Sequence, residues 1–293
     1  KNRTWHQFTG VLENLTQLHQ MLFDQCPVQI LHSVAEKLTS LRQLSAQFVM
    51  DAVLSDAQMW STNAKIDFDK FKGMTELKEL TIRGACGLVL VNGLSGLASL
   101  NKLTNLSLTA LKNVKDEEYK FLESLTLLEE LELGDCDLMD ETGFKQLENL
   151  SKLKLLRLEG RNENVSSLAV LGKSLQSMQK LTSLELVKFG LNEEFLECIK
   201  SLKLTHLKLW PETETRTAEI NSAVFKMVSE MTSLKYLEWA ISGDQVKDGA
   251  NPEELHQNQS ILLLKEEGEG ARVANTREIS EKLIKTLPKA SIR

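Results

Sequence analysis

The sequence predicts an α/β repeat solenoid, in which a curved sheet of parallel strands lines the concave side and helices cover the convex side. Two observations predict it. A leucine phrase recurs at nearly constant spacing through most of the 293 residues, and segments with a helical spacing of apolar residues separate its copies. Leucine is correspondingly abundant, with 53 residues, whereas only 5% of the residues are aromatic.

The phrase reads L-x-x-L-x-L and follows a short lead-in such as LTSL, MTEL or LNKL. The alternation at its end has the period of a strand that buries one face. A single strand cannot bury its leucines alone, so neighbouring copies have to stack and share one core. About 8–9 repeats are expected, because copies start at residues 15, 41, 77, 103, 128, 153, 181, 204 and 234, the first two being weak.

Helices are expected between the strands, where apolar residues follow helical spacing, as Ile220, Val224 and Val228 do. The expected helical segments are 116–125, 142–150, 166–178, 193–202 and 216–231. The longer gap between Leu41 and Leu77 predicts an insertion around residues 51–71, with Trp60 at its centre.

Three parts are expected along the chain: residues 1–14 form an N-terminal helix or cap, residues 15–264 the repeats, and residues 265–293 a C-terminal cap helix. Terminal repeats need a polar outer face, which is the role expected of the caps. In the last part, Asn275 or Thr276 is a suitable helix start, and Pro288 lies just past the expected helix end.

The phrase resembles the leucine-rich repeat, whose unit is L-x-x-L-x-L-x-x-N/C-x-L. The copy from Leu128 to Leu138 matches it best, with Cys136 at the N/C position. Most copies are 23 to 30 residues apart, and this spacing resembles the intracellular, ribonuclease-inhibitor-like subclass. The first residues, R-T-W-H-Q-F, resemble the tail of an F-box. The resemblance implies a concave strand face that binds a protein partner.

Charge and composition exclude some classes of partner. The formal charge of −6 argues against nucleic acid, because phosphate binding needs a basic surface. The longest apolar runs, such as residues 261–264, are far below the roughly 20 residues that cross a bilayer. We therefore expect neither a nucleic-acid partner nor a membrane span.

The cysteines favour a reducing compartment and a cytoplasmic or nuclear location, since they are few and lie 50 to 62 residues apart. Six N-x-S/T sequons are the opposing signal, although three of them lie inside the repeated phrase. All four cysteines are expected to be free thiols: Cys26, Cys86, Cys136 and Cys198.

No pattern in the sequence predicts catalysis. The five histidines form no H-x-x-x-H pair, and the glycines form neither a dinucleotide fingerprint nor a P-loop. We expect no enzyme activity, no metal and no cofactor.

The non-leucine strand positions predict a partner site in the late repeats. These positions are small and neutral in the early copies, acidic in the middle, and aromatic and charged in the late copies, and interface energy concentrates on Trp, Tyr and Arg. The alternative is that these late side chains cover one another and the partner binds near Trp60. The predicted contact residues are Arg157, Glu159, Glu185, His206, Lys208, Trp210, Tyr236 and Glu238.

Three functions fit this prediction. The resemblance implies the substrate-recognition region of an F-box-type ubiquitin ligase receptor. The alternatives are the ligand-sensing domain of a nucleotide-binding immune receptor and a free-standing inhibitor or adaptor. In each case a protein partner is expected to bind a monomeric solenoid that can join a larger complex.

Overall fold

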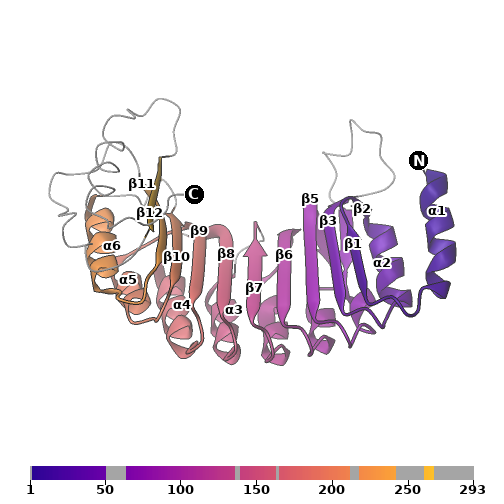
Figure 1. Cartoon of the computed structure of the whole chain (residues 1–293), viewed down its shortest axis with the longest axis horizontal. Helices are drawn as coiled ribbons and strands as arrows, with labels where there is room; N and C mark the ends of the chain where they lie inside the picture. Colours follow the sequence, from indigo (N-terminus) through magenta and orange to yellow (C-terminus); the bar gives the residue numbers. More distant parts are fainter. Residues whose placement is uncertain are drawn as a thin grey trace. The chain divides into compact units, whose positions relative to one another are not determined.

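The computed structural model describes residues 2–50, 64–135, 139–162, 165–211, 218–241 and 261–266. The chain divides into two compact units, Lys1–Leu153 (unit 1) and Lys154–Arg293 (unit 2). Each unit consists of parallel strands joined by helical segments (Figure 1). The predicted α/β solenoid of parallel strands and helices is confirmed.

Unit 1 begins with α1 (Asn2–Val11) and the 3-10 helix η1 (Leu12–Asn14). Its main strands pair in parallel and in chain order: β1 (Gln20–Phe23), β3 (Gln43–Met50), β5 (Glu79–Val91), β6 (Asn105–Lys112) and β7 (Glu130–Gly134). Two short strands, β2 (Cys26–Pro27) and β4 (Ala64–Asp67), pair with the far ends of β3 and β5. The connections are α2 (Val28–Lys37), η2 (Phe68–Phe71), η3 (Ser95–Ser99), η4 (Asp116–Ser124), α3 (Glu141–Gln146) and η5 (Leu147–Asn149).

Unit 2 has the same alternation, with an α-helix in each of its described connections. Its strands also pair in chain order: β8 (Leu155–Asn162), β9 (Ser183–Phe189), β10 (His206–Pro211), β11 (Tyr236–Ile241) and β12 (Ile261–Glu266). The helices between them are α4 (Val165–Ser177), α5 (Glu193–Lys200) and α6 (Ala218–Glu230). These helices pack against one another in sequence order on one side of the strands (Figure 1). None of the described helices of the chain is long and apolar enough to cross a membrane.

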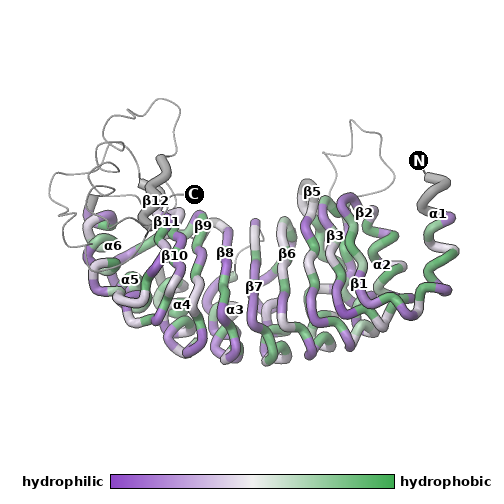
Figure 2. Tube along the Cα trace, in the orientation of Figure 1, coloured by the Kyte–Doolittle hydropathy of each residue, from purple (hydrophilic) through white to green (hydrophobic). Residues whose placement is uncertain are grey.

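The core of each unit is built from the leucines of the repeated phrase. In β10, Leu207 and Leu209 are fully buried, whereas the residues between and beside them are not. Leu184 lies beside Leu207 in the paired strands and is also fully buried. Figure 2 shows the resulting alternation of hydrophobic and hydrophilic residues along the strands. Trp239 takes a leucine position in β11 and is buried, as its place in the phrase predicts.

Ahead of each strand, apolar residues recur at every third position. Leu94, Leu97, Leu100 and Leu103 are all fully buried, and the N–H groups of the last three each donate to the carbonyl three residues earlier. Such i→i+3 bonds, with side chains eclipsed, are the geometry of a 3-10 helix. The helix expected over residues 116–125 accordingly forms as a 3-10 helix, η4, rather than as an α-helix.

At seven places among the described residues, one backbone carbonyl fixes where the next strand begins. The Lys78 carbonyl accepts the N–H groups of both Thr104 and Asn105, and the Thr182 carbonyl accepts those of Thr205 and His206. The register of each such strand is therefore set by the repeat before it. The same double acceptance recurs at His19, Arg42, Thr104, Lys154 and Thr205.

The repeats at both ends differ from the prediction. The first copy is three residues later than predicted, at Leu18, Met21 and Phe23, because the residues before it share the three-residue period of the phrase. The structure also contains β12, which the sequence analysis did not predict and which extends two residues into the segment assigned to the C-terminal cap. Residues 64–71 of the expected insertion form β4 and η2. Residues 51–63, including Trp60, and 267–293 lie outside the described residues.

Asn221 is a polar residue at a core position of α6. It is 4% exposed, and neither of its side-chain amide atoms has a hydrogen-bond partner among the described residues. Asn221 precedes Leu234 by the same number of residues as Leu168 of α4 precedes Leu181, and Leu168 is buried. Asparagine therefore occupies a position that leucine occupies in a matching repeat.

Replacing Asn221 by leucine is expected to raise the free energy of unfolding by about 1–3 kcal/mol, which is the cost of a buried polar group left unpaired. Both side chains branch at Cγ, so the change keeps the shape of the side chain. Chemical denaturation would measure the gain, and the reverse exchange, Leu168→Asn, should destabilise unit 2. A loss of stability in Asn221→Leu would show that the amide is hydrogen-bonded in solution.

Candidate functional site

The candidate site is the side of β8, β9, β10 and β11 that faces away from the buried leucines, here called the unit 2 strand face. In its middle row Arg157 pairs in register with Glu185, Glu185 with Lys208, and Lys208 with Glu238. Positive and negative residues thus alternate across four neighbouring strands. Opposite charges directly across a strand pair stabilise the sheet.

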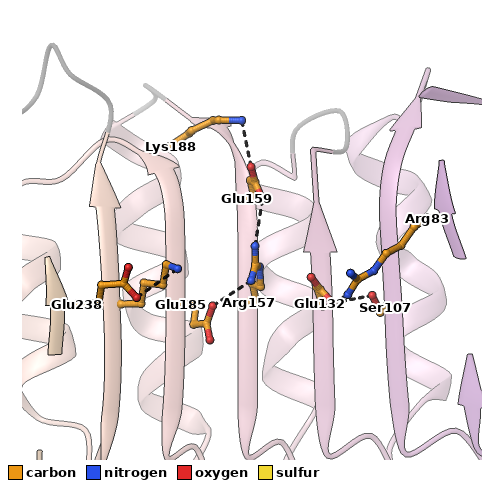
Figure 3. A network of polar contacts seen from close by, with 9 residues as sticks. Arg83, Ser107, Glu132, Arg157, Glu159, Glu185, Lys188 and Glu238 are labelled. Carbon is orange, nitrogen blue, oxygen red and sulfur yellow. Dashed lines mark hydrogen bonds and ion pairs between the residues drawn. The ribbon is translucent and has the colours of Figure 1, made fainter. Parts of the chain in front are cut away.

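At the β8 side of this face, two cations surround one carboxylate (Figure 3). Arg157 Nη2 lies 3.4 Å from Glu159 Oε2, and Lys188 Nζ lies 3.1 Å from Glu159 Oε1. Arg157 also reaches Glu185 Oε2 through Nη1, at 3.3 Å. Lys188 was missed by the sequence analysis, which considered the positions between and just after the leucines. Lys188 is further along β9 and has a left-handed φ of 61°.

At the β10 and β11 side, rings lie beside both members of a second ion pair: Trp210 beside Lys208, and Tyr236 beside Glu238 with His206 next to it. These three residues are here called the aromatic cluster. Lys208 Nζ lies 3.4 Å from Glu238 Oε2 and 4.2 Å from the centre of the Trp210 ring. The Tyr236 hydroxyl donates to the same Glu238 oxygen at 3.0 Å. The ring centres of His206 and Tyr236 are 5.8 Å apart.

The Tyr236 hydroxyl is held in its neutral form. Burial, the hydrogen bond to Glu238 and the charges of Glu238 and Glu185 together raise its pKa to about 12. Tyr236 therefore remains a hydrogen-bond donor throughout the physiological pH range.

The structure places all eight predicted contact residues on this one face. Arg157 and Glu159 come from β8, Glu185 from β9, the next three from β10, and Tyr236 and Glu238 from β11. The sequence predicted that these residues share a face, but not which charges pair or that Glu238 contacts both Lys208 and Tyr236. Their role in binding a partner stays a prediction. Trp60, the centre of the alternative site, lies outside the described residues.

The corresponding face of unit 1 has a different character. Glu132 Oε2 accepts hydrogen bonds from Arg83 Nη2 at 2.9 Å and Ser107 Oγ at 2.7 Å (Figure 3). On this face Leu22 is 68% exposed, and Phe48, further along β3, is 50% exposed. Leu22 occupies the position that Ser45 occupies in the next repeat, and the sequence analysis missed it because its first copy was out of register.

The remaining titratable groups give no indication of a metal site among the described residues. In the part of the chain that the structure describes, no three His, Cys, Asp or Glu side chains are grouped so that they could hold a metal ion. Cys26 and Cys198 are free thiols; burial raises the pKa of Cys26 to about 12 and also raises that of Cys198. Burial lowers the pKa of His32, which accepts a hydrogen bond from the Asp67 N–H through Nε2.

Parallel strands, helical connections and the repeated L-x-x-L-x-L phrase together define the leucine-rich repeat fold. A solved internalin (inlF) from Listeria monocytogenes has a similar fold, with a TM-score of 0.51 and 15% identity over 96% of this chain and 76% of that chain. At this identity the likeness concerns the fold alone. No family model matches the sequence, and no curated protein matches it.

Two further solved structures align with lower scores. An internalin C2 from Listeria monocytogenes has a TM-score of 0.46 and 18% identity, covering 79% of this chain and 84% of that chain. TLR13, solved in a complex with ssRNA13, has a TM-score of 0.49 and 18% identity, covering 92% of this chain and 38% of that chain. Neither alignment carries an argument about function. The expected absence of a nucleic-acid partner stays a prediction.

Proposed function

We propose that this chain is a protein-interaction scaffold whose partner binds the unit 2 strand face. The observation that carries the proposal is the aromatic cluster, in which His206, Trp210 and Tyr236 stand on rigid neighbouring strands beside partly buried charges. Aromatic side chains on a fixed surface lose little conformational entropy on binding, and Trp and Tyr carry much of the energy of protein interfaces.

The charges support the same proposal. Arg157, Lys208 and the three glutamates are held by partners on neighbouring strands, so their positions are set before a partner arrives. A preorganised surface loses less free energy to side-chain ordering on binding than a mobile one does.

The test uses the whole chain as bait, with Trp210 and Tyr236 each replaced by alanine and then both together. Proteins captured by the wild-type chain and lost by the double variant are purified, and their dissociation constants are measured by calorimetry. Each single replacement is expected to weaken binding by about 30-fold, because anchor residues contribute about 2 kcal/mol or more.

The matched control is Phe48→Ala, which removes an exposed aromatic side chain from unit 1. It should leave the affinity unchanged. Partners that bind the double variant as tightly as the wild type, but are lost with Phe48→Ala, would place the site on unit 1 instead.

Within this class, we propose the more specific role of substrate-recognition region of an F-box-type ubiquitin ligase receptor, acting in the cytoplasm or nucleus. The resemblance of R-T-W-H-Q-F to the tail of an F-box and the α-helix-backed repeats of unit 2 support it. The sequence of the full gene product ahead of Lys1 tests this role. An F-box there, with binding of the full-length protein to the ligase adaptor, is the expected result, whereas an ATPase module there would favour the immune-receptor alternative.

A further inference from the structure

The ion pairs of the unit 2 strand face involve three cations and three carboxylates, but these are unevenly distributed over the face. Glu159 is contacted by both Arg157 and Lys188. Arg157 is shared between Glu159 and Glu185. The ammonium of Lys208 therefore lies between two carboxylates, Glu185 on one neighbouring strand and Glu238 on the other. The part of the face around the aromatic cluster therefore has an excess of negative charge. The pKa of Tyr236 reflects the same field, since both carboxylates raise it.

The two carboxylates also keep hydrogen-bonding capacity. Each uses only Oε2 in the ion pairs and hydrogen bonds that the structure describes, and the cations lie 3.3 Å from Glu185 and 3.4 Å from Glu238. Charge-assisted hydrogen bonds are usually shorter, about 2.7–2.9 Å. The side chains are 27% and 17% exposed, so water satisfies their remaining lone pairs only in part. A donor that approached both carboxylates more closely would therefore form stronger hydrogen bonds than the present cations do.

The aromatic cluster suits a cation as well. Lys208 Nζ already lies over the Trp210 ring, at 4.2 Å from its centre, which shows that this ring face accepts a positive charge. The neighbouring rings of His206 and Tyr236 are tilted by only 32° from one another and present a second stacking surface. A guanidinium combines a planar stacking face with a fork of N–H donors that matches carboxylates, whereas an ammonium offers only a point charge.

We propose that the partner inserts an arginine side chain between Glu185 and Glu238 and over the aromatic cluster, and that Lys208 is an internal substitute for it that moves aside on binding. This proposal rests on the proposed function and specifies the partner chemistry, a protein segment bearing an exposed arginine. The chain's net charge of −6 favours the approach of a basic partner. An acidic partner at this part of the face would meet Lys208, which is already paired with Glu238.

The experiment selects phage-displayed random dodecapeptides on the immobilised whole chain and sequences the retained pool. Arginine is expected to be enriched. A selected peptide is then synthesised, and its affinity is compared with that of a copy in which citrulline replaces the arginine, which keeps the shape and removes the charge. The citrulline peptide should bind at least tenfold more weakly.

Two variants of the chain give opposite expected results. Glu238→Gln should weaken the binding of the arginine peptide at least tenfold. Lys208→Met, which removes the internal competitor but keeps an apolar side chain beside Trp210, should strengthen the binding of this peptide several-fold. Lys200→Met, which removes a paired ammonium from α5 rather than from the strand face, is the matched control and should change the affinity less than twofold. Circular dichroism confirms that each variant is folded.

The proposal is overturned by a pool enriched in acidic peptides, by a pool without site-dependent enrichment, or by weaker binding of the arginine peptide to Lys208→Met. Peptides whose binding depends on Trp210 and Tyr236 but that contain no arginine would contradict this inference and still support the proposed function. Peptides that bind the Trp210→Ala and Tyr236→Ala variants with unchanged affinity would contradict both the inference and the proposed function.

Discussion

Replacing Leu184 by alanine is expected to lower the free energy of unfolding by about 2–5 kcal/mol. Leu184 is fully buried and lies in register between Leu156 and Leu207 on the neighbouring strands. Because the three leucines form one continuous row in the core, the alanine leaves a cavity that the adjacent repeats can fill only in part. Urea denaturation followed by circular dichroism measures the loss.

The control for Leu184→Ala is Ser183→Ala, in the same strand but on its half-exposed side. It should change the stability by no more than about 0.5 kcal/mol, as surface replacements usually do. A loss below about 1 kcal/mol for Leu184→Ala, or equal losses for the two variants, would contradict the assignment of leucines to the core and of their neighbours to the unit 2 strand face.

Replacing Gly96 by alanine is expected to destabilise unit 1 by about 1–3 kcal/mol, because it overpacks a close contact between two repeats. Gly96 belongs to η3, and a methyl group there would lie within 3.0 Å of backbone atoms of Phe68 and Asp69 in η2. Backbone atoms cannot turn aside as a flexible side chain does, so the two segments would have to separate. Thermal unfolding of the two proteins under the same conditions checks the result.

Gly10→Ala is the matched control for Gly96→Ala. Gly10 lies exposed in α1, and a methyl group on it would meet nothing within 4 Å. Alanine is a better helix former than glycine, so this variant should be neutral or more stable by up to about 1 kcal/mol. Destabilisation by both variants, or by neither, would show that the contact of η3 with Phe68 does not limit packing.

Most of the fold could be predicted because every repeat has to bury its leucines in the same way. Leu80, Leu106 and Leu131 stand at the same place in successive phrases and lie side by side in the paired strands. The first repeat was predicted in the wrong register because the residues that lead into it, Leu12 and Leu15, have the three-residue spacing that also begins the phrase. Only the pairing of β1 with β3 resolves that ambiguity, and pairing is a property of the folded chain.

The residues of the candidate site could be predicted from the sequence, but not which of them contact one another. The alternation of the strands brings Lys208 and Glu238 to one face, which follows from sequence period alone. That Lys208 turns toward Glu238 and Trp210 rather than Glu185 depends on side-chain rotamers, which the period does not specify. Lys188 escaped prediction for a related reason, since a left-handed residue near the end of β9 interrupts the regular alternation.

The carbonyls that accept two N–H groups just ahead of a strand determine which parts of this chain can vary in length. The carbonyl of Arg42 accepts from Lys78 and Glu79 across 36 residues, and that of Thr182 accepts from Thr205 and His206 across 23, with the same result at the strand. The residues between one strand and the next lead-in can therefore grow or shrink while the strands stay aligned. Duplication or loss of a complete repeat conserves every donor and acceptor. Residues added within the helical connections, or as whole repeats, therefore leave the ladder of strands unchanged.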